Sequence, residues 1–176
     1  MGLYGILAVA AVIVGAVRGD VDIYRLEETT RPWKLLASPF LGIGVGLVLV
    51  FASRWAVHRF GWARRLHRAF RGILGTLHKR DILVLAVASA VGEELLFRGA
   101  LLPWLGLWPS TLIFALLHIG PGSKFLPWAV QAFGVGLLFG WLFLVMGDLG
   151  APIVAHFVVN FLNLNYIVRV ELPREA

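Results

Sequence analysis

The chain has 176 residues, of which 59% are hydrophobic and 15% are charged, and its mean hydropathy is +0.83. This composition is far more apolar than that of soluble domains and indicates an integral membrane protein. The sequence contains no cysteine, which excludes disulfides, thiolate metal sites and cysteine nucleophiles. The net charge is +6, but half of the 16 Lys and Arg residues lie in segment 54–80, so we expect a topology signal and no nucleic-acid partner.

The N-terminal third predicts two membrane-spanning helices. Residues 2–17 form an apolar run a little shorter than the ~20 residues that a span needs, and we interpret it as a retained first span. A short apolar segment is also typical of a signal peptide, which is the alternative. The second apolar run covers about 35–53 and contains Gly42, Gly44 and Gly46. Such small residues predict a close approach to another helix within the bilayer.

Segment 54–80 carries half of the chain's basic residues and no acidic residue. Aromatic and aliphatic residues are interleaved with them at helical spacing, which predicts an amphipathic helix lying on an anionic membrane leaflet. A solvated basic loop is the alternative for a segment of this kind. Under both interpretations the positive charge predicts a cytoplasmic location.

Four further apolar segments complete the predicted fold, at about 81–102, 108–119, 126–146 and 150–168. We expect the first of these to end at Pro103, and Gly120-Pro121-Gly122 is a strong turn signal after the second. No internal repeat or soluble domain is evident in the sequence. The sequence therefore predicts one all-α polytopic membrane domain over residues 1–176, with about six transmembrane helices and a basic amphipathic interfacial helix.

Three charged residues interrupt the third predicted span. Glu93, Glu94 and Arg98 lie in an otherwise apolar run, where each charge at mid-membrane costs about 2.5–3.5 kcal/mol. Glu94 and Arg98 are four residues apart, so they share one helix face and are predicted to pair. Glu93 points about 100° away around the helix and lacks that partner. It is therefore the candidate for chemistry.

Two histidines lie at a similar predicted depth. His118 follows Phe114 by four residues and Asn160 follows His156 by four, so each pair shares a helix face. At about 1.5 Å per residue, Glu93 and both histidines fall between the midplane and the outer third of a core about 30 Å thick. Each histidine alone is more typical of packing or of an interhelical polar contact. Their common depth favours a shared site.

This set of side chains suits amide hydrolysis by an activated water molecule. Glu93 can act as a general base, His118 and His156 can stabilise an oxyanion or protonate a leaving amine, and the Asn160 amide can complete an oxyanion hole. No serine or threonine in the spans has a histidine at a local helical spacing, which disfavours a nucleophilic pair. The candidate catalytic residues are Glu93, His118, His156 and Asn160, and the supporting residues are Glu94, Arg98 and Phe114.

At these residues the chain resembles the CPBP family of intramembrane proteases, which includes the type II CAAX prenyl endopeptidases and bacterial bacteriocin-processing and immunity proteins. The family's motifs EExxxR, FxxxH and HxxxN are present at 93–98, 114–118 and 156–160. The resemblance covers a catalytic core of about 80–165 and does not extend to the N-terminal third. It implies that Glu93 activates water while the histidines and Asn160 orient the water and stabilise the oxyanion.

The resemblance leaves open whether the site uses a metal. A zinc ion would be held by Glu93, His118 and His156. We favour a metal-free mechanism, because the carboxylate needed as the third ligand is also needed as the base. The implied partner is a membrane-associated protein substrate. The short chain is similar to the compact myxosortase-like bacterial branch, which processes C-terminal sorting tails, so we expect the bacterial inner (cell) membrane with both termini cytoplasmic.

A non-catalytic membrane protein is the alternative. The same polar residues can form the network of a scaffold, an immunity protein or a proton-coupled carrier. A carrier would often show inverted repeats, and the acidic motif has no counterpart in the first half of the chain. Binding alone does not require all four candidate catalytic residues, which favours an enzyme.

Overall fold

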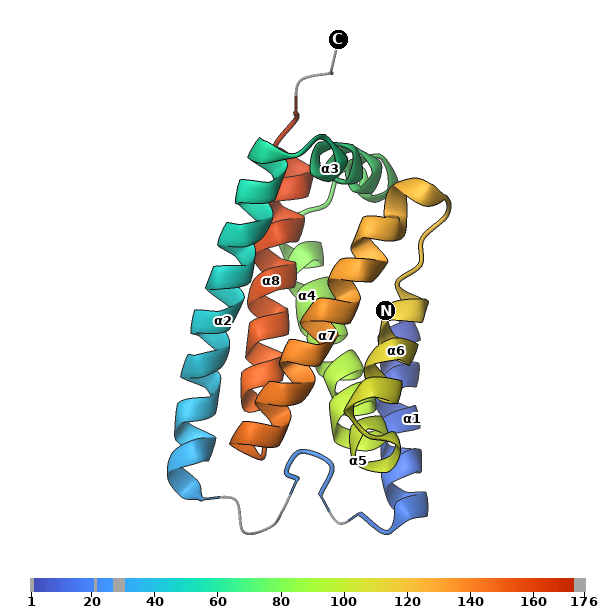
Figure 1. The fold of residues 1–176 in the computed structure, drawn as a ribbon, viewed down its shortest axis with the longest axis vertical. Helices are drawn as coiled ribbons and strands as arrows, with labels where there is room; N and C mark the ends of the chain where they lie inside the picture. The colour runs from blue at the N-terminus through green and yellow to red at the C-terminus, as the bar shows by residue number, and fades with distance from the viewer. Residues whose placement is uncertain (1, 21, 27–30, 173–176) are drawn as a thin grey trace.

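The fold is a bundle of long helices with one shorter helix lying across an end (Figure 1). A computed structural model describes residues 2–20, 22–26 and 31–172. The helices are α1 (Gly2–Arg18), α2 (Pro32–Arg59), α3 (Gly61–Leu74), α4 (Lys79–Glu94), the π-helix η1 (Leu95–Leu101), α5 (Leu102–Leu105), α6 (Leu107–Leu117), the 3₁₀-helix η2 (Ser123–Phe125), α7 (Leu126–Met146) and α8 (Gly150–Arg169). The described part of the chain contains no β-strand, which confirms the all-α prediction.

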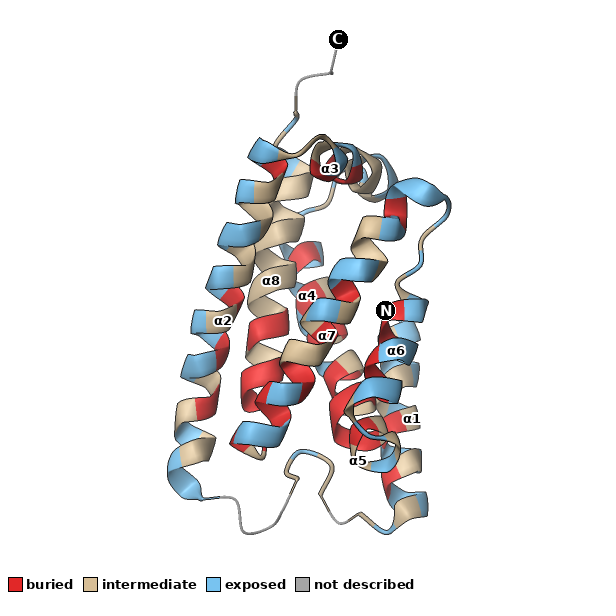
Figure 2. Cartoon of the chain, viewed as in Figure 1, coloured by how far each residue is buried: buried red, intermediate tan, exposed pale blue. Residues whose placement is uncertain are grey.

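The outward faces of the bundle are apolar, as expected of a membrane protein. Three helical stretches are long and apolar enough to cross a membrane, namely α2, Ser123–Met146 and α8. The other predicted spans are helical too, but α1 and α6 are shorter, with 17 and 11 residues. Buried residues line the inside of the bundle and exposed residues its outside (Figure 2). Many of the exposed residues are large hydrophobic ones, including Val17 and Phe40.

Glycines let α2 lie directly against α8. A Cβ atom at Gly42 would lie 2.5 Å from the carbonyl oxygen of Ala151, and one at Gly46 would lie 2.8 Å from the Val158 Cβ. Close approach of this kind replaces side-chain packing by backbone contact, the usual role of small residues in membrane helices. The prediction for the small residues of α2 is confirmed at these two positions. It is wrong for Gly44, which has open space beside it.

Two predicted boundaries are wrong. The second span extends to Arg59 instead of ending near residue 53, so only α3 forms a separate amphipathic helix. The extension is stable because Arg54 donates a hydrogen bond to the Leu162 carbonyl of α8, at 2.8 Å. The third predicted span continues past Pro103, which lies in the first turn of α5, and ends at Gly106 with φ +87°. Proline is tolerated in a first helical turn because the N–H it lacks is not needed there.

A π-helical segment follows the two glutamates directly. The Leu102 N–H bonds the carbonyl of Phe97, five residues earlier, as a π-helix requires. Gly99 within this segment faces the loop after α1, where an added Cβ would lie 2.5 Å from the carbonyl oxygen of Ile23. The wider turn carries Arg98 into the interior, where its side chain is 2% exposed.

Basic side chains of α3 satisfy the free carbonyls at the C-terminus of α8. Arg71 Nη1 donates to the carbonyls of Ile167, at 3.0 Å, and of Val168. His67 Nε2 lies 2.9 Å from the carbonyl oxygen of Val170. The last carbonyls of a helix lack partners within it, and positive charge is favourable at that end. These bonds fasten α3 across the end of the bundle.

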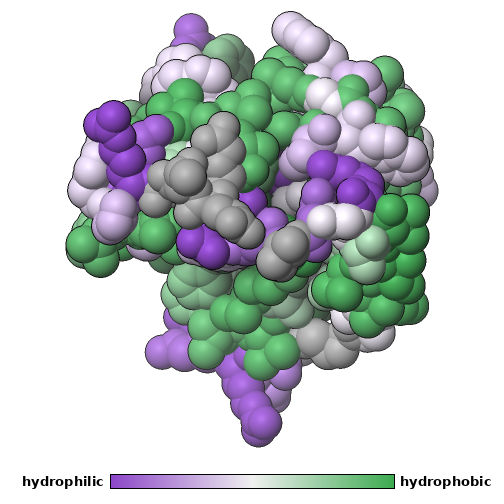
Figure 3. Space-filling view, turned by 90° about the horizontal axis from the view of Figure 1, so that it is seen from below, coloured by the Kyte–Doolittle hydropathy of each residue, from purple (hydrophilic) through white to green (hydrophobic). Residues whose placement is uncertain are grey.

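The loop between α1 and α2 packs on the opposite end. The Tyr24 carbonyl accepts a hydrogen bond from the Leu149 N–H, and the Leu26 N–H donates to the Gly147 carbonyl. Asp148 is fully buried here and accepts the N–H of Gly150 at the start of α8. Seen from this end, hydrophilic residues lie among hydrophobic ones (Figure 3).

Candidate active site

The predicted pairing of Glu94 with Arg98 is confirmed. Arg98 Nη1 lies 2.7 Å from Glu94 Oε1, and both side chains are buried, at 2% and 0% exposure. Arg98 Nη2 also donates to the Gly136 carbonyl at 3.2 Å, and the guanidinium carbon lies 4.5 Å from the centre of the Phe114 ring. A buried ion pair is tolerated only when further contacts of this kind offset the cost of removing both charges from water.

Helix α7 comes close to Arg98 because residue 136 is a glycine. A Cβ atom there would lie 2.9 Å from Thr111 Cγ2 and 3.5 Å from Arg98 Nη2. Phe114 would be 3.3 Å away. The absence of a side chain therefore lets the α7 backbone supply the carbonyl that Arg98 needs.

His156 on α8 links the two glutamates. Its Nδ1 lies 2.7 Å from Glu94 Oε1, and its Nε2 lies 3.8 Å from Glu93 Oε2. An ionised carboxylate only accepts hydrogen bonds, so Nδ1 carries the hydrogen. In the neutral ring, Nε2 then presents a lone pair toward Glu93. One oxygen of Glu94 thus orients both Arg98 and His156.

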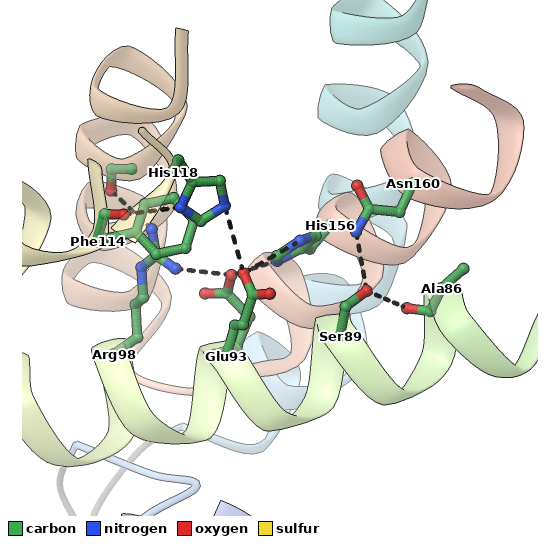
Figure 4. Close-up of polar contacts among 10 residues, drawn as sticks. Ala86, Ser89, Glu93, Arg98, Phe114, His118, His156 and Asn160 are labelled. Carbon is green, nitrogen blue, oxygen red and sulfur yellow. Dashed lines mark hydrogen bonds and ion pairs between the residues drawn. The ribbon is translucent and has the colours of Figure 1, made fainter. Parts of the chain in front are cut away.

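His118 reaches the same carboxylate from the C-terminal end of α6. Its Nδ1 lies 2.7 Å from the Phe114 carbonyl oxygen, so Nδ1 is again the donor. Its Nε2 lies 3.8 Å from Glu93 Oε2. The ring packs against Phe114 and Trp128, with centroid distances of 4.2 and 4.9 Å. Two histidines from different helices therefore face one oxygen of Glu93 (Figure 4).

Among the described residues, Glu93 has no direct partner at that oxygen, whereas Glu94 bonds Arg98 and His156 through Oε1 and lacks a hydrogen bond only at Oε2. Glu93 Oε2 is buried and makes no hydrogen bond within the described part of the chain. The 3.8 Å separations from the two histidines are too long for hydrogen bonds. The sequence-based distinction between a paired Glu94 and an unneutralised Glu93 holds in this geometry.

The same atoms do not have the spacing of a metal site. No group of three or more His, Cys, Asp or Glu side chains in the described ranges is arranged to hold a metal ion. Ligand atoms about 2.0–2.1 Å from a tetrahedral zinc lie about 3.3–3.4 Å apart, which is closer than the 3.8 Å around Glu93 Oε2. The residues as placed do not fit zinc. The expectation of a metal-free site stays a prediction.

Asn160 lies one turn after His156 and bonds a residue that the sequence did not identify as its partner. Its Nδ2 donates to Ser89 Oγ at 2.9 Å, and Ser89 Oγ donates to the Ala86 carbonyl at 3.3 Å (Figure 4). Ser89 is 3% exposed and precedes Glu93 by four residues on α4. Residues four apart share a helix face, so the spacing of Ser89 and Glu93 is the sequence signal that could have identified Ser89 as part of the site.

A cavity of about 360 Å³ connects these residues with α3. The histidines and Glu93 line one end, which we call the glutamate end. The other end, the α3 end, is lined by residues of α2, α3 and α8, among them Ser53, Arg54, Leu66, His67, Asn163 and Tyr166. Tyr4 of α1 lines the cavity as well. His58, His67 and His78 received no role from the sequence, yet His67 is buried and lies at this cavity.

Comparison with known proteins identifies the part of the chain that holds the glutamate end. Residues 78–162 match the family model described as type II CAAX prenyl endopeptidase Rce1-like. This segment is similar to the Rce1-like family. The Rce1-like match contains all three sequence motifs, which confirms the resemblance over that range.

One curated relative is similar to the chain over a stretch about as long as the Rce1-like match. The chain is 39% identical over 82 residues to the "Uncharacterized protein YpbD" of Bacillus subtilis (strain 168). The alignment covers 45% of this chain and 41% of that protein, so it spans about two fifths of the relative. No solved structure matches the chain. Helices α1, α2 and α3 lie outside the Rce1-like match.

Proposed function

We propose that the protein is an intramembrane endopeptidase that hydrolyses a peptide bond of a membrane-associated protein, using water activated by Glu93. The observation that carries this proposal is the contrast between the two glutamates. Glu94 is occupied by Arg98 and His156, at 2.7 Å each, whereas Glu93 Oε2 is faced by two histidine Nε2 atoms at 3.8 Å. A buried base with nearby hydrogen-bonding groups is what water activation requires.

The hydrogen-bond roles of the histidines suggest how the reaction proceeds. With Nδ1 as the donor, each neutral ring accepts a hydrogen bond at Nε2, so a water molecule that donates one hydrogen to Glu93 can donate its other hydrogen to one of the two histidines. Glu93 takes one proton from the water as its oxygen bonds to the carbonyl carbon. The same proton then passes to the leaving nitrogen as the carbon–nitrogen bond breaks. The second N–H of the Asn160 amide is the candidate donor to the oxyanion.

The cavity favours a substrate segment that enters from the α3 end. The cavity lining reaches residues of α3, whose buried face contains Ala63, Leu66 and His67. Arg65 on the other face is exposed, which supports our proposal that α3 rests on an anionic leaflet. If the basic segment is cytoplasmic, substrates are presented from that side. Entry from that side differs from processing near the outer third of the membrane, toward which the depth estimate places Glu93 and the histidines.

Membrane proteomics tests the proposed activity directly. Cells carrying the wild-type protein or the Glu93→Gln variant, at matched expression, are compared for membrane proteins whose C-terminal peptides persist only in the variant. We expect a reproducible set of retained segments. Glu171→Gln is the matched control, because it makes the same change at an exposed residue outside the cavity. Identical proteomes for wild type and Glu93→Gln would refute catalysis and leave the non-catalytic scaffold.

A further inference from the structure

The cavity has opposite charges at its two ends. Of the described residues that line it, Glu93 is the one acidic residue and Arg54 the one Lys or Arg. Glu93 lies at the glutamate end with His118 and His156. Arg54 lies at the α3 end, near the C-terminus of α2. A substrate in this cavity therefore meets a carboxylate at one end and a guanidinium at the other.

Contacts with α8 hold the Arg54 side chain in place. Arg54 Nη2 donates to the Leu162 carbonyl at 2.8 Å, and the guanidinium carbon lies 3.7 Å from the centre of the Tyr166 ring. The bond to Leu162 uses one of the five N–H groups that a guanidinium carries. The flat fork of a guanidinium matches a carboxylate in bidentate geometry, and a side chain already positioned loses less entropy on binding.

The two charged groups are close enough to act on one bound segment. His156 contacts the glutamates and Leu162 contacts Arg54, and these residues are six positions apart on α8. At about 1.5 Å per residue, the separation along the helix is about 9 Å. An extended peptide advances about 3.3 Å per residue, so a short segment covers this distance.

Charge complementarity fixes the direction of such a segment. A carboxylate removed from water is costly unless it is paired, and it would be repelled by Glu93 at the glutamate end. We propose that Arg54 is a specificity-determining residue that binds a carboxylate of the substrate and directs the scissile bond toward Glu93. This inference rests on the proposed function. Arg54 lies outside residues 78–162, so the Rce1-like match does not include it.

A binding assay with the full chain tests the inference without turnover. The Glu93→Gln protein in detergent micelles is titrated with three dansyl-labelled apolar peptides of equal length. One has a free C-terminal carboxylate, one is amidated, and one is amidated but carries a glutamate side chain. Trp62 and Trp128 line the cavity and serve as energy donors to the dansyl group. We expect at least one of the two acidic peptides to bind fivefold or more tightly than the neutral amide, and the tighter one identifies the carboxylate as terminal or side-chain.

Substitutions assign the preference to Arg54. In the Glu93→Gln background, Arg54→Gln is expected to reduce the preference for the acidic peptide to less than twofold. Arg54→Lys keeps the charge but not the bidentate fork, so an intermediate preference is expected. Arg59→Gln removes an exposed charge from the same helix and should leave the preference unchanged.

Several outcomes would overturn the inference: equal binding of the three peptides, no binding of any peptide, or an unchanged preference in Arg54→Gln. If Arg54→Gln does not fold, Arg54→Lys decides, and an unchanged preference there has the same meaning. The assay does not depend on cleavage. A failure of the proposed protease function would appear in the proteomic comparison, so the two failures are distinguishable.

Discussion

The charged side chains at the two ends of the cavity are held by different kinds of bond. At the glutamate end, Glu94 forms a buried ion pair with Arg98 and bonds His156, although Arg98 also bonds the Gly136 carbonyl. At the α3 end, the arginines bond backbone carbonyls, as Arg54 does with that of Leu162 and Arg71 with that of Ile167, and one side-chain bond joins Ser53 to Asn163. A side-chain pair requires two specific residues, whereas any residue supplies a carbonyl. The paired charges at the glutamate end therefore leave a spacing signal in the sequence, whereas the arginines at the α3 end do not.

The largest expected effect comes from breaking the buried ion pair. Glu94→Gln removes the charge that faces Arg98, which is 2% exposed. Removing one partner of a buried pair costs about 3–5 kcal/mol, because the other charge stays buried without compensation. We expect a loss of this size in the free energy of unfolding, measured by denaturant unfolding in micelles. Glu171→Gln, at an exposed position, is the control. An unchanged unfolding midpoint would contradict the structural role of Glu94.

A smaller loss in the free energy of unfolding is expected where α7 approaches the Glu94–Arg98 pair. Gly136→Ala places a Cβ atom 2.9 Å from Thr111 Cγ2, so neighbouring groups must shift. Overpacking of this kind costs about 1–3 kcal/mol. Gly134→Ala on the same helix is the matched control, because no atom beyond its chain neighbours and its own helix backbone lies within 4 Å of its Cβ position. We expect Gly134→Ala to be neutral or stabilising in the same unfolding measurement. Equal stabilities of the two variants would show that α7 is not held by close approach at Gly136.

The bond between Ser89 and Asn160 gives a third test of the glutamate end. Ser89→Ala removes the acceptor of the Asn160 amide, which costs about 0.5–1.5 kcal/mol of stability. We expect retained substrate segments in the proteomic comparison, because Asn160 loses its fixed orientation, and we expect Ser89→Thr to restore processing. Ser110→Ala is the control, since this buried hydroxyl bonds only the Leu107 carbonyl among the described contacts. Normal processing by Ser89→Ala would show that activity does not require the bond that orients Asn160.

The smallest effect concerns pH at the α3 end. Burial lowers the pKa of His67 below 6.5, and the positive charges of Arg71, Arg54 and Arg68 lower it further. The bond to the Val170 carbonyl raises this pKa but does not reverse the shift. The unfolded chain therefore binds a proton more readily, so stability conferred by neutral His67 is present above about pH 6.5 and declines as the pH falls through that value. Unfolding is measured from about pH 8 to pH 5.5.

The His67 variant isolates this contribution from those of the other titratable groups. His67→Gln should lower the dependence of unfolding free energy on pH, whereas His58→Gln, at an exposed position, should not. Parallel pH profiles for wild type and His67→Gln would show that His67 does not contribute to this dependence.

The spacing of residues along the sequence was sufficient to predict several features of the fold and the site. Hydrophobic runs located the helices, and the amphipathic pattern located α3, because helix formation depends on residues within a few turns. The pairing of Glu94 with Arg98 also followed from spacing, since residues four apart are neighbours on any helix. The exact ends of α2 and α5 did not follow, because contacts with α8 and the π-helical turn determine them.

The sequence by itself determined an all-helical membrane protein and the residues able to do chemistry. Only the tertiary structure decided which of these residues meet. Ser89 and Asn160 are 71 positions apart, and Glu94 and His156 are 62 apart, so neither contact has a periodic signal. The π-helix and the approach of α7 at Gly136 likewise depend on neighbouring helices. Arg54 belonged to a basic segment by sequence, and only the packing of α2 against α8 placed it at the cavity that contains Glu93.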